Sequence, residues 1–599
     1  MVKSAFVEMG NTLPLHSIPP KEEFLKEIDK YSSLHWDTGN YFSRSLGQTD
    51  ESFEEQSQAV MNFTQAIDDY IDPLKQGLFL KSRVIAGSPG SGKSYLMNYS
   101  ILYAISKGLN VCINAVMSKR ANVLGGIHIH KLFKLPCKNG LNMHSMAELD
   151  VTDMLRAPET IQVLRTLNIL FIDEIGQLSA QMLAVLDIIL RQIRNNNIFF
   201  GGILILATLD HRQLPPVKGL PFLVSQNVLT CFKFSILDNS VRAQEDSNLQ
   251  RIIFIARLHP DKYSTDIISK FEILVSNCFT FVDDWNDPII TPDIFRIFSK
   301  KLPARHAVDA YISQVKAQLL YNEYIERKSV DTQKQRSSLS EWSVANETTL
   351  NLLDRILKEP RSLLFFVGAI VEFTCNEHNK FSQSQIGLIL QLPSQDDVDN
   401  FKNIIVMVAP PEIKEFVFNG ELDERYYTDL GWKNENVGLS HQYEVSVNNG
   451  MKGQRKQYCL KHHVTSTVHS CQGNTLHKIV TEIKCSDKHY QIWEKGQVVV
   501  LVSRTKRAED IIFVGNKRET IKCLTIAIQT KSQWMDYQAK VMALVDVRND
   551  AHTVDTLPIF TYDSFPFQIR SVRLPDCNTG FVYFLISINI GGRRISVSL

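Results

Sequence analysis

The stretch Gly87-Ser88-Pro89-Gly90-Ser91-Gly92-Lys93-Ser94 fits G-x-x-x-x-G-K-[ST], the pattern of a phosphate-binding loop. The apolar run at residues 83–86 predicts a buried strand before it, and residues 95–106 predict a helix after it. A strand, a glycine-rich turn and a helix place backbone N–H groups and the positive end of the helix around a phosphate. We therefore expect the whole loop to cradle a triphosphate, with Lys93 on the β- and γ-phosphates and Ser94 on Mg²⁺.

Composition bounds the class of protein. The chain has 599 residues, enough for three or four domains, and its 44% hydrophobic content is ordinary for a globular protein. No run of about eighteen apolar residues predicts a spanning helix, and the N-terminal residues lack a signal-peptide core. The net charge of +1 means that a nucleic-acid site has to be a local groove. The ten cysteines include no C-x-x-C pair and no zinc spacing, which predicts reduced, buried thiols in an intracellular protein.

A second motif follows the loop at a distance that suits nucleotide chemistry. Residues 167–172 are apolar and predict a strand that ends in Asp173-Glu174. A nucleotide hydrolase needs one carboxylate for Mg²⁺ and another to orient or deprotonate water. A helix at residues 182–193 and a further strand at 203–208 complete an alternation that predicts a doubly wound parallel sheet. Its nucleotide should lie at the carboxyl ends of the strands.

Several other polar residues have both a functional and a structural interpretation. Gln56, in a segment with helical character, would read an adenine edge or be a solvated helix residue. His130 and Lys131 follow two glycines and would approach a phosphodiester backbone, or form a structural turn. Gln213 precedes the stiff pair Pro215-Pro216 and would sense a γ-phosphate.

The composition and residue pattern change at two places in the second half of the chain. Residues 326–342 are polar and rich in Ser and Gln, which indicates a surface linker or insertion loop. Residues 363–413 contain short β-like runs, which predict a small β-rich insertion. Residues 498–502 then predict an apolar strand that ends at Ser503-Arg504 and presents a guanidinium to a phosphate across a domain cleft.

Taken in order, the phosphate loop, Asp173-Glu174 and residues 213–217, 469–475 and 500–504 resemble the motif series of superfamily-one helicases. They look most like the RecD-related, petite-integration-frequency (Pif-type) DNA helicases, including those of Helitron transposons. The resemblance covers roughly residues 53–515 and implies an α/β fold of two RecA-like, doubly wound parallel-sheet domains, with the β-rich insertion in the second.

The resemblance divides the chain into five parts. They are an N-terminal extension (1–52), the first RecA-like domain (53–233), the second (234–359 and 450–529), the β-rich insertion (360–449) and a C-terminal tail (530–599).

It also implies a role for each candidate residue. ATP would be bound by Gln56 and by the loop residues Gly87, Ser88, Pro89, Gly90, Ser91, Gly92, Lys93 and Ser94. Ser94 and Asp173 would hold Mg²⁺. The catalytic set would be Lys93, Asp173, Glu174 as the activator of water, Gln213 as a γ-phosphate sensor, and Arg242 and Arg504 from the second domain. DNA would be contacted by His130, Lys131, His469, Gln472 and Gly473.

The implied activity is ATP-driven translocation on single-stranded DNA, 5′ to 3′, with unwinding of duplex DNA in replication, repair, recombination or telomere maintenance. An RNA helicase of the same superfamily and a non-catalytic nucleic-acid-binding remnant of a transposon helicase are the alternatives. Two departures bear on coupling: residues 116–120 replace the usual Thr-Gly pair, and Leu209 replaces a glycine. Neither removes a group that hydrolysis requires, so altered DNA coupling is expected before loss of ATPase activity.

Residues 579–587 in the tail resemble the opening strand of a GIY-YIG nuclease domain, although an ordinary strand is the better interpretation. A nuclear location follows only from the resemblance, with a mitochondrial one as the alternative. No membrane contact is expected, and the sequence does not identify any protein partners.

Overall fold

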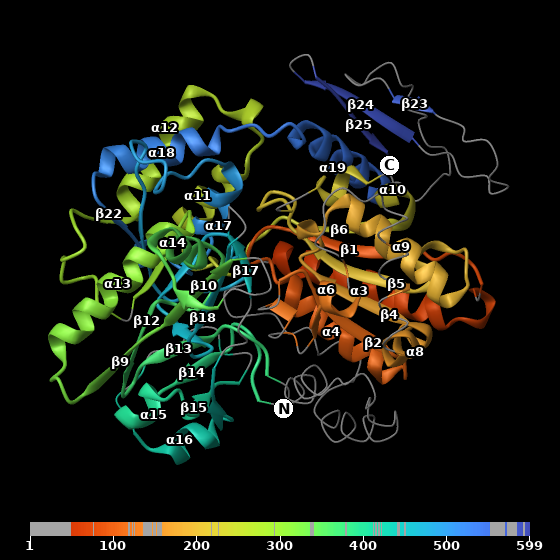
Figure 1. Cartoon of the computed structure of the whole chain (residues 1–599). Helices are drawn as coiled ribbons and strands as arrows, with labels where there is room; N and C mark the ends of the chain where they lie inside the picture. The colour runs from red at the N-terminus through yellow and green to blue at the C-terminus, as the bar shows by residue number, and fades with distance from the viewer. Residues whose placement is uncertain are drawn as a thin grey trace.

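The computed structural model describes residues 50–550, with internal gaps, and residues 569–571, 584–590 and 593–598. The gaps are 76, 118–119, 122–123, 125, 134, 136–146, 148–150, 153–157, 217–218, 226, 293, 336–340, 378–379, 411–412, 414–415, 417, 419, 421, 440–443 and 448–450. Two α/β lobes lie side by side, and a β-rich unit extends from the second lobe (Figure 1).

Lobe one is built on a six-stranded parallel sheet in the order β3-β2-β4-β5-β1-β6. The strands are β1 (Ser82–Gly87), β2 (Val111–Ala115), β3 (Ile127–His128), β4 (Ile169–Asp173), β5 (Leu204–Leu209) and β6 (Phe232–Leu237). The helices are α3 (Asp50–Ile71), α4 (Lys93–Ser106), α6 (Ile129–Leu132), α8 (Pro158–Thr166), α9 (Ala180–Arg194) and α10 (Asn227–Cys231). Every residue of β4 and β5 is buried, as expected for strands covered on both faces.

Lobe two has a five-stranded parallel sheet in the order β20-β8-β21-β22-β7. The strands are β7 (Thr280–Val282), β8 (Phe295–Phe298), β20 (Thr465–Thr467), β21 (Ile479–Glu482) and β22 (Ile511–Val514). The helices are α11 (Ser247–Arg257), α12 (Thr265–Cys278), α13 (Lys301–Gln318), α17 (Lys495–Val502) and α18 (Lys517–Ile528). The doubly wound, two-lobed α/β prediction is therefore confirmed.

The strand predicted at residues 498–502 is wrong, because this run forms most of helix α17. All eight residues of α17 are buried, with α11 and α18 packed against the helix, and its last five residues are all apolar, so this run has no amphipathic pattern. A short apolar run of this kind cannot be told from a buried strand by periodicity.

The antiparallel insertion is longer than the one expected. Its strands are β9 (Tyr324–Lys328), β10 (Val330–Gln335), β11 (Ser343–Val344), β12 (Ser362–Phe366), β13 (Ile370–Phe373), β14 (Ile386–Leu388), β15 (Ile404–Val408), β16 (Lys433–Val437), β17 (Val445–Val447), β18 (Met451–Lys456) and β19 (Leu460–His462). Its helices are α14 (Glu347–Ile356), α15 (Gln395–Asp399) and α16 (Glu424–Asp429). The polar segment 326–342 thus contributes paired strands rather than a loop, since β9 pairs with β12 and β10 with β18.

The boundaries therefore differ from those expected at three places. Strand β6 extends lobe one to Leu237, and the insertion runs from β9 to β19. Helix α19 (Met535–Asp550), in the tail, returns to lobe one and packs on β6. Val541, Met542 and Val545 join the apolar core of that lobe. The two lobes are thus joined by this helix as well as by residues 238–246.

Beyond α19, strands β23 (Ile569–Ser571), β24 (Phe584–Ile590) and β25 (Arg593–Ser598) form an antiparallel sheet. Residues 579–583 of the nuclease-like stretch lie outside the described residues. The GIY-YIG resemblance therefore stays a prediction. Within the described part of the chain, no helix has the length and apolar character needed to cross a membrane.

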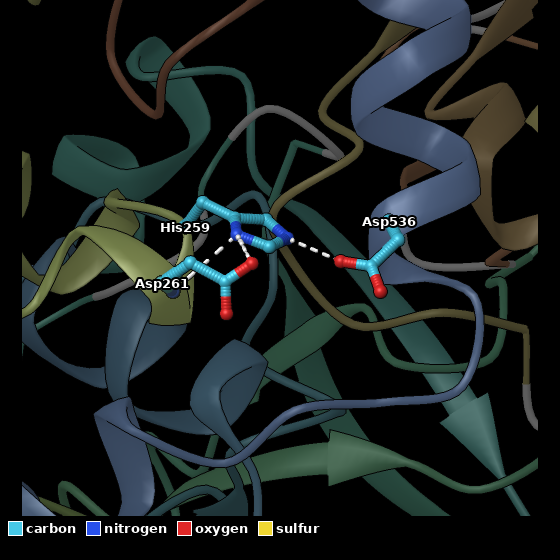
Figure 2. Close-up of side chains that lie close together, drawn as sticks. All are labelled: His259, Asp261 and Asp536. Carbon is cyan, nitrogen blue, oxygen red and sulfur yellow. Dashed lines mark hydrogen bonds and ion pairs between the residues drawn. The ribbon is translucent and has the colours of Figure 1, made fainter.

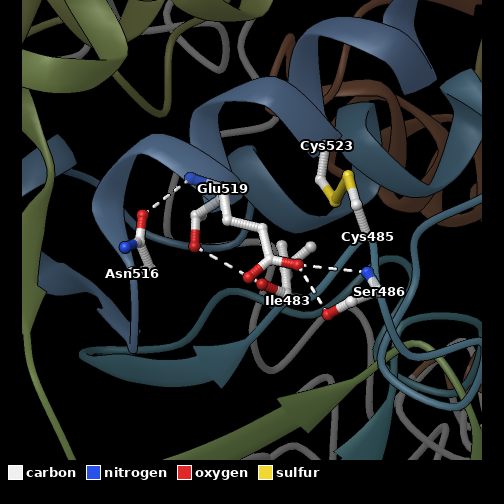
Figure 3. The surroundings of a disulfide bond; sticks show 7 residues. Ile483, Cys485, Ser486, Asn516, Glu519 and Cys523 are labelled. Atoms are coloured by element: carbon white, nitrogen blue, oxygen red, sulfur yellow. Dashed lines mark hydrogen bonds between the residues drawn. A yellow bond between two sulfur atoms is a disulfide. The ribbon is translucent and has the colours of Figure 1, made fainter.

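The cysteine prediction is wrong at one pair. Cys485, after β21, and Cys523, on α18, form a disulfide with 5.6 Å between their Cα atoms (Figure 3). Glu519 on the same helix accepts hydrogen bonds from the backbone N–H and the hydroxyl of Ser486. The pair lies 38 residues apart in sequence, so no local Cys spacing could have indicated it. Six cysteines in the described residues are free thiols, as predicted.

Candidate nucleotide-binding site between two lobes

The phosphate loop connects β1 to α4, as the sequence predicted. Gly90 and Gly92 have φ values of +79° and +89°, which a residue with a side chain rarely adopts. The Lys93 ammonium donates to the carbonyl oxygens of Gly87 at 3.1 Å and Ser88 at 2.8 Å. Burial lowers the pKa of Lys93. A buried cation that is paired only with loop carbonyls is suited to receive an anion.

Gln56, on α3, contacts this loop through its side-chain amide. Its side-chain nitrogen donates to the Ser91 carbonyl at 2.7 Å. A Cβ atom on Gly92 would lie 2.6 Å from the same nitrogen, and the φ of +89° at Gly92 favours glycine there. The adenine-reading role of Gln56 stays a prediction, because this amide is engaged with the loop.

Asp173 and Glu174 lie at the carboxyl end of β4, beside the loop. Asp173 Oδ1 accepts from the Thr208 hydroxyl at 2.6 Å and lies 3.4 Å from the Ser94 hydroxyl. Thr208, at the end of β5, also accepts from the Glu174 backbone N–H at 2.9 Å. One threonine therefore fixes both acids. It is a functional residue that the sequence reasoning missed, because it is an ordinary residue of an apolar strand.

The two acids differ in protonation behaviour. Burial alone would raise the pKa of Asp173, but the charge of Arg120 and hydrogen bonds from Thr208 and Arg120 hold that pKa below its usual value. Burial raises the pKa of Glu174 in spite of the attraction of Lys93, and the Asp173 charge adds to the rise. One carboxylate is thus suited to bind a cation and the other to accept a proton.

Arg120 occupies the space between the loop and Asp173. Its Nε donates to Asp173 Oδ2 at 2.9 Å, and its Nη2 donates to the same oxygen and to the Ser94 hydroxyl. Arg120 belongs to the segment in which the sequence departs from the usual Thr-Gly pair. That departure was the available signal, but the sequence did not show that the arginine points into the site.

The Gln213 turn connects the two lobes. Gln213 is buried, and its nitrogen donates to Asp210 Oδ2 at 2.8 Å, while its Oε1 has no partner among the described residues. Asp210 also pairs with Arg257 of α11 in lobe two, at 2.7 Å. Burial would raise the pKa of Asp210, yet the charges of Arg257 and Lys93 lower it to about 2. Asp210 and Arg257 were missed, because their partnership joins residues 47 positions apart.

Arg242 lies directly against the phosphate loop. The backbone N–H groups of Val241 and Arg242 both donate to the Gly90 carbonyl, at 2.9 and 3.1 Å. The guanidinium donates to the Ser503 carbonyl of lobe two at 2.7 Å. Burial, and then the charge of Arg504, lower the pKa of Arg242. No carboxylate among the described residues forms an ion pair with it, which leaves an uncompensated positive charge beside the loop.

Arg504 is fully buried in lobe two. Its guanidinium donates to the carbonyls of Val500, Cys471 and Asn474 and to the Ser503 hydroxyl. It would have to exchange some of these bonds to contact a phosphate. In this conformation Arg504 therefore organises the segment that holds Arg242, rather than facing the loop itself.

The residues expected to contact DNA fall into two groups. In lobe one, His130 is partly buried, its ring lies 5.3 Å from that of His128, and Lys131 is exposed. In lobe two, His469 stacks near Trp493, with 6.4 Å between the ring centroids. Gln472 is buried, and the carbonyl of Gly473 lies 3.3 Å from Arg120 Nη1. Gly473 thus reaches the nucleotide side of the cleft.

A separate cluster of His259, Asp261 and Asp536 has the spacing of metal ligands (Figure 2). Lys531 lies 3.1 Å from Asp261 and 3.0 Å from Asp536, so its ammonium already balances these exposed carboxylates. Asp536 belongs to α19 and His259 to lobe two. The cluster therefore serves as an ionic contact between the start of α19 and lobe two.

These features define a class of protein. Two parallel-sheet lobes meet at a phosphate loop that carries a lysine, a strand-end pair of acids and an arginine from the segment that links the lobes. This is the organisation of a RecA-like nucleoside triphosphatase with its nucleotide site between two lobes.

Comparison with known proteins narrows the class. Residues 55–254 match the PIF1-like helicase family. The ATP-dependent DNA helicase Pif1 of Psychrobacter sp. (strain PRwf-1) is 33% identical over 147 residues, which are 24% of this chain and 21% of the relative. Uncharacterized protein 030L of Invertebrate iridescent virus 6 is 24% identical over 536 residues, which are 79% of this chain and 95% of the relative.

The crystal structure of Pif1 helicase from Candida albicans superposes with a TM-score of 0.56 at 20% identity, covering 82% of this chain and 98% of that one. At this identity the likeness concerns the fold. The chain is thus similar to the PIF1-like helicase family over residues 55–254, and its fold is similar to that of a Pif1 helicase. The resemblance found in the motif order is thereby confirmed, while its Helitron association stays a prediction.

Proposed function

We propose that the protein is an ATP-dependent DNA helicase that hydrolyses Mg·ATP, moves 5′ to 3′ along single-stranded DNA and separates the duplex ahead. The observation that carries this proposal is the convergence of distant residues on one loop. Ser94 meets Asp173, and the Gly90 carbonyl accepts from the backbone of Arg242, whose guanidinium contacts lobe two. A site shared between lobes changes when the lobes move, as a motor requires.

In the proposed hydrolysis, different residues of the chain bind the phosphates, hold the metal and activate the water. The loop N–H groups and Lys93 bind the β- and γ-phosphates, and Ser94 and Asp173 provide oxygens of the kind that Mg²⁺ prefers. When bound, Mg²⁺ would neutralise phosphate charge. Glu174 orients water and accepts its proton, for which its raised pKa is suitable. Arg242 balances negative charge on the γ-phosphate from the side of the linker.

The proposed DNA contacts come from both lobes. His130, Lys131 and His469 would meet the strand, and Gln472 and Gly473 would connect that track to the nucleotide. Support comes from Gly473, whose carbonyl lies against Arg120 while His469 is partly exposed four residues earlier. Direction of movement rests on the family alone. Roles in replication, repair, recombination or telomere maintenance, and a nuclear or mitochondrial location, are likewise proposals.

A strand-displacement assay with 5′-tailed and 3′-tailed duplexes, with and without ATP, tests the activity and the direction together. We expect ATP-dependent displacement of the 5′-tailed substrate only. Displacement from the 3′ tail alone would overturn the polarity. ATPase stimulation by RNA but not by single-stranded DNA would favour the RNA helicase, and DNA binding without hydrolysis would favour the non-catalytic remnant.

A further inference from the structure

The position of Arg120 in the nucleotide site has a consequence for metal binding. The side chain is almost completely buried, at 4% exposure, and it forks onto Asp173 Oδ2 while also donating to the Ser94 hydroxyl. A planar guanidinium that contacts a carboxylate through two nitrogens makes a strong and geometrically specific pair. It is held between the two side chains that offer oxygen ligands to a divalent cation.

A guanidinium and a metal would compete for two of those oxygens, Asp173 Oδ2 and Ser94 Oγ, while Asp173 Oδ1 accepts from the Thr208 hydroxyl. Mg²⁺ prefers oxygen ligands at about 2.0–2.1 Å in near-octahedral geometry. A guanidinium that donates to Asp173 Oδ2 and to the Ser94 hydroxyl engages lone pairs that the metal would use and places a like charge close to it. The donor set therefore fits Mg²⁺, but only after the arginine has moved away.

Arg120 also contacts lobe two. Its Nη1 donates to the Gly473 carbonyl at 3.3 Å. A Cβ atom on Gly473 would lie 2.8 Å from Arg120 Cδ, and Gly473 has a φ of +79°, so glycine is needed for this approach. One guanidinium thus connects the phosphate loop, the strand-end acid and a segment of lobe two that is expected to lie along the DNA.

We propose that Arg120 is a positioning residue that competes with Mg²⁺ for Asp173 and Ser94. It leaves these two side chains when the Mg-nucleotide binds, and its contact with Gly473 is released at the same time. The inference rests on the proposed function for the identity of the ligand. It goes beyond that function, because it makes metal binding itself the event that alters a contact between the lobes.

Removing Arg120 should therefore strengthen metal binding. The apparent affinity for a ligand falls by the fraction of molecules that are competent to bind it, and the wild-type protein keeps this fraction low while the guanidinium is in place. Coupling between two binding events in proteins commonly changes affinity by about 5- to 150-fold. We expect Arg120→Ala to lower the half-saturating Mg²⁺ concentration by a factor within that range.

The test measures binding of a fluorescent ADP analogue to the full chain while Mg²⁺ is titrated, with each protein's affinity in EDTA as its own reference. Arg120→Lys should give an intermediate value, since its ammonium keeps the charge but cannot fork onto Asp173. Arg455→Ala is the matched control. It removes another buried arginine, paired with Asp331 and Asp354 in the insertion, and should leave the Mg²⁺ dependence unchanged.

An unchanged or raised half-saturating Mg²⁺ concentration in Arg120→Ala would overturn the proposal. Should that variant not fold, a crystal structure of the wild-type protein with Mg²⁺ and a non-hydrolysable ATP analogue decides the question. We expect the guanidinium to have left Asp173, and a guanidinium still seated there beside the metal would refute the idea. Because these readouts use neither DNA nor turnover, they stay distinct from a failure to unwind.

Discussion

Glu174 combines two unfavourable conditions that only the surrounding fold can sustain. It has a φ of 55°, which is uncommon for a residue with a side chain, and its carboxyl is buried. The Thr208 hydroxyl holds its backbone N–H, and the buried Asp173 lies beside it in sequence. This backbone conformation turns the carboxyl toward the phosphate loop, where its burial raises its pKa.

Lys93 provides the most direct test at this scale. We expect Lys93→Ala to reduce ATP hydrolysis by at least about 10²-fold, because a charge aimed at the reacting phosphates is lost. DNA binding should be largely retained, since Lys93 contacts only loop carbonyls. Steady-state ATPase and filter-binding measurements check both. Hydrolysis at the wild-type rate would show that the loop is not the catalytic nucleotide site.

Arg504 should behave as a structural residue as well as a site residue. Arg504→Ala removes a donor from each of the carbonyls of Val500, Cys471 and Asn474, and we expect a loss of stability on the order of 3–5 kcal/mol. Thermal unfolding measures it. The control is Arg507→Ala, which removes an exposed side chain that pairs with the exposed Glu509. We expect it to change the free energy of unfolding by under about 0.5 kcal/mol. Equal losses would mean that the buried bonds contribute little.

His462 makes the insertion sensitive to acid. Burial lowers the pKa of His462 from 6.5 to about 4, and its Nε2 accepts from the Leu364 N–H. Between pH 4 and pH 6.5 the unfolded chain therefore binds more protons than the folded chain. The stability that neutral His462 contributes is present above pH 6.5 and is lost as the pH falls toward 4. The full difference amounts to about 3 kcal/mol at about 1.36 kcal/mol per pKa unit. Urea unfolding at pH 7 and pH 5 should show a smaller decline in the free energy of unfolding for His462→Gln than for the wild-type protein. An identical decline would show that other groups cause it.

At the scale of single elements, the sequence predicted correctly those strands and helices that have a strong local pattern of apolar residues. The β1–loop–α4 unit and the buried strands β4 and β5 follow from apolar runs that are bounded by turns. Helix α17 did not follow, since tertiary burial on every side removes its periodicity. Strands β9 and β10 are half-exposed and polar, so they resemble a loop until their partners β12 and β18 are known.

Helix α19 supplies a prediction about an element. Val541 is buried in the core of lobe one, while Ala543 on the same helix is exposed. We expect Val541→Asp to weaken the docking of α19 by about 3 kcal/mol or more, because an unpaired carboxylate would enter an apolar core. Hydrogen exchange of residues 535–545 should then quicken strongly. Ala543→Asp introduces the same residue on the exposed face and should not change it. Equal effects would mean that α19 does not dock through this face.

The arrangement of the whole molecule depends on contacts that no local pattern reveals. The motif order predicted two lobes and most of the residues around the phosphate loop. It did not predict that Arg120 bonds with Gly473, or that α19 returns to lobe one, because these partners are separated by hundreds of residues. The charges of the site were likewise visible as residue types, while their pairing was decided by how the lobes meet.

The buried ion pair between Asp210 and Arg257 allows the connection of the lobes to be tested. Asp210 directly follows β5 of lobe one and Arg257 is the last residue of α11 in lobe two, with 2.7 Å between the charged atoms. Breaking such a pair from either side leaves a charge without its partner and typically costs about 3–5 kcal/mol. We expect Arg257→Ala and Asp210→Ala each to reduce the stimulation of ATP hydrolysis by single-stranded DNA, because the Gln213 turn loses its anchor on lobe two.

A double-mutant cycle separates this contact from general damage. If the two side chains act together, the double variant should be no more impaired than either single variant, with an interaction term of about 1–3 kcal/mol in DNA-stimulated turnover. Purely additive losses would show that each residue acts alone and that the lobes communicate elsewhere. The exposed pair Lys270 and Asp266 on α12 is a suitable control cycle, because it lies within one helix and should show almost no interaction.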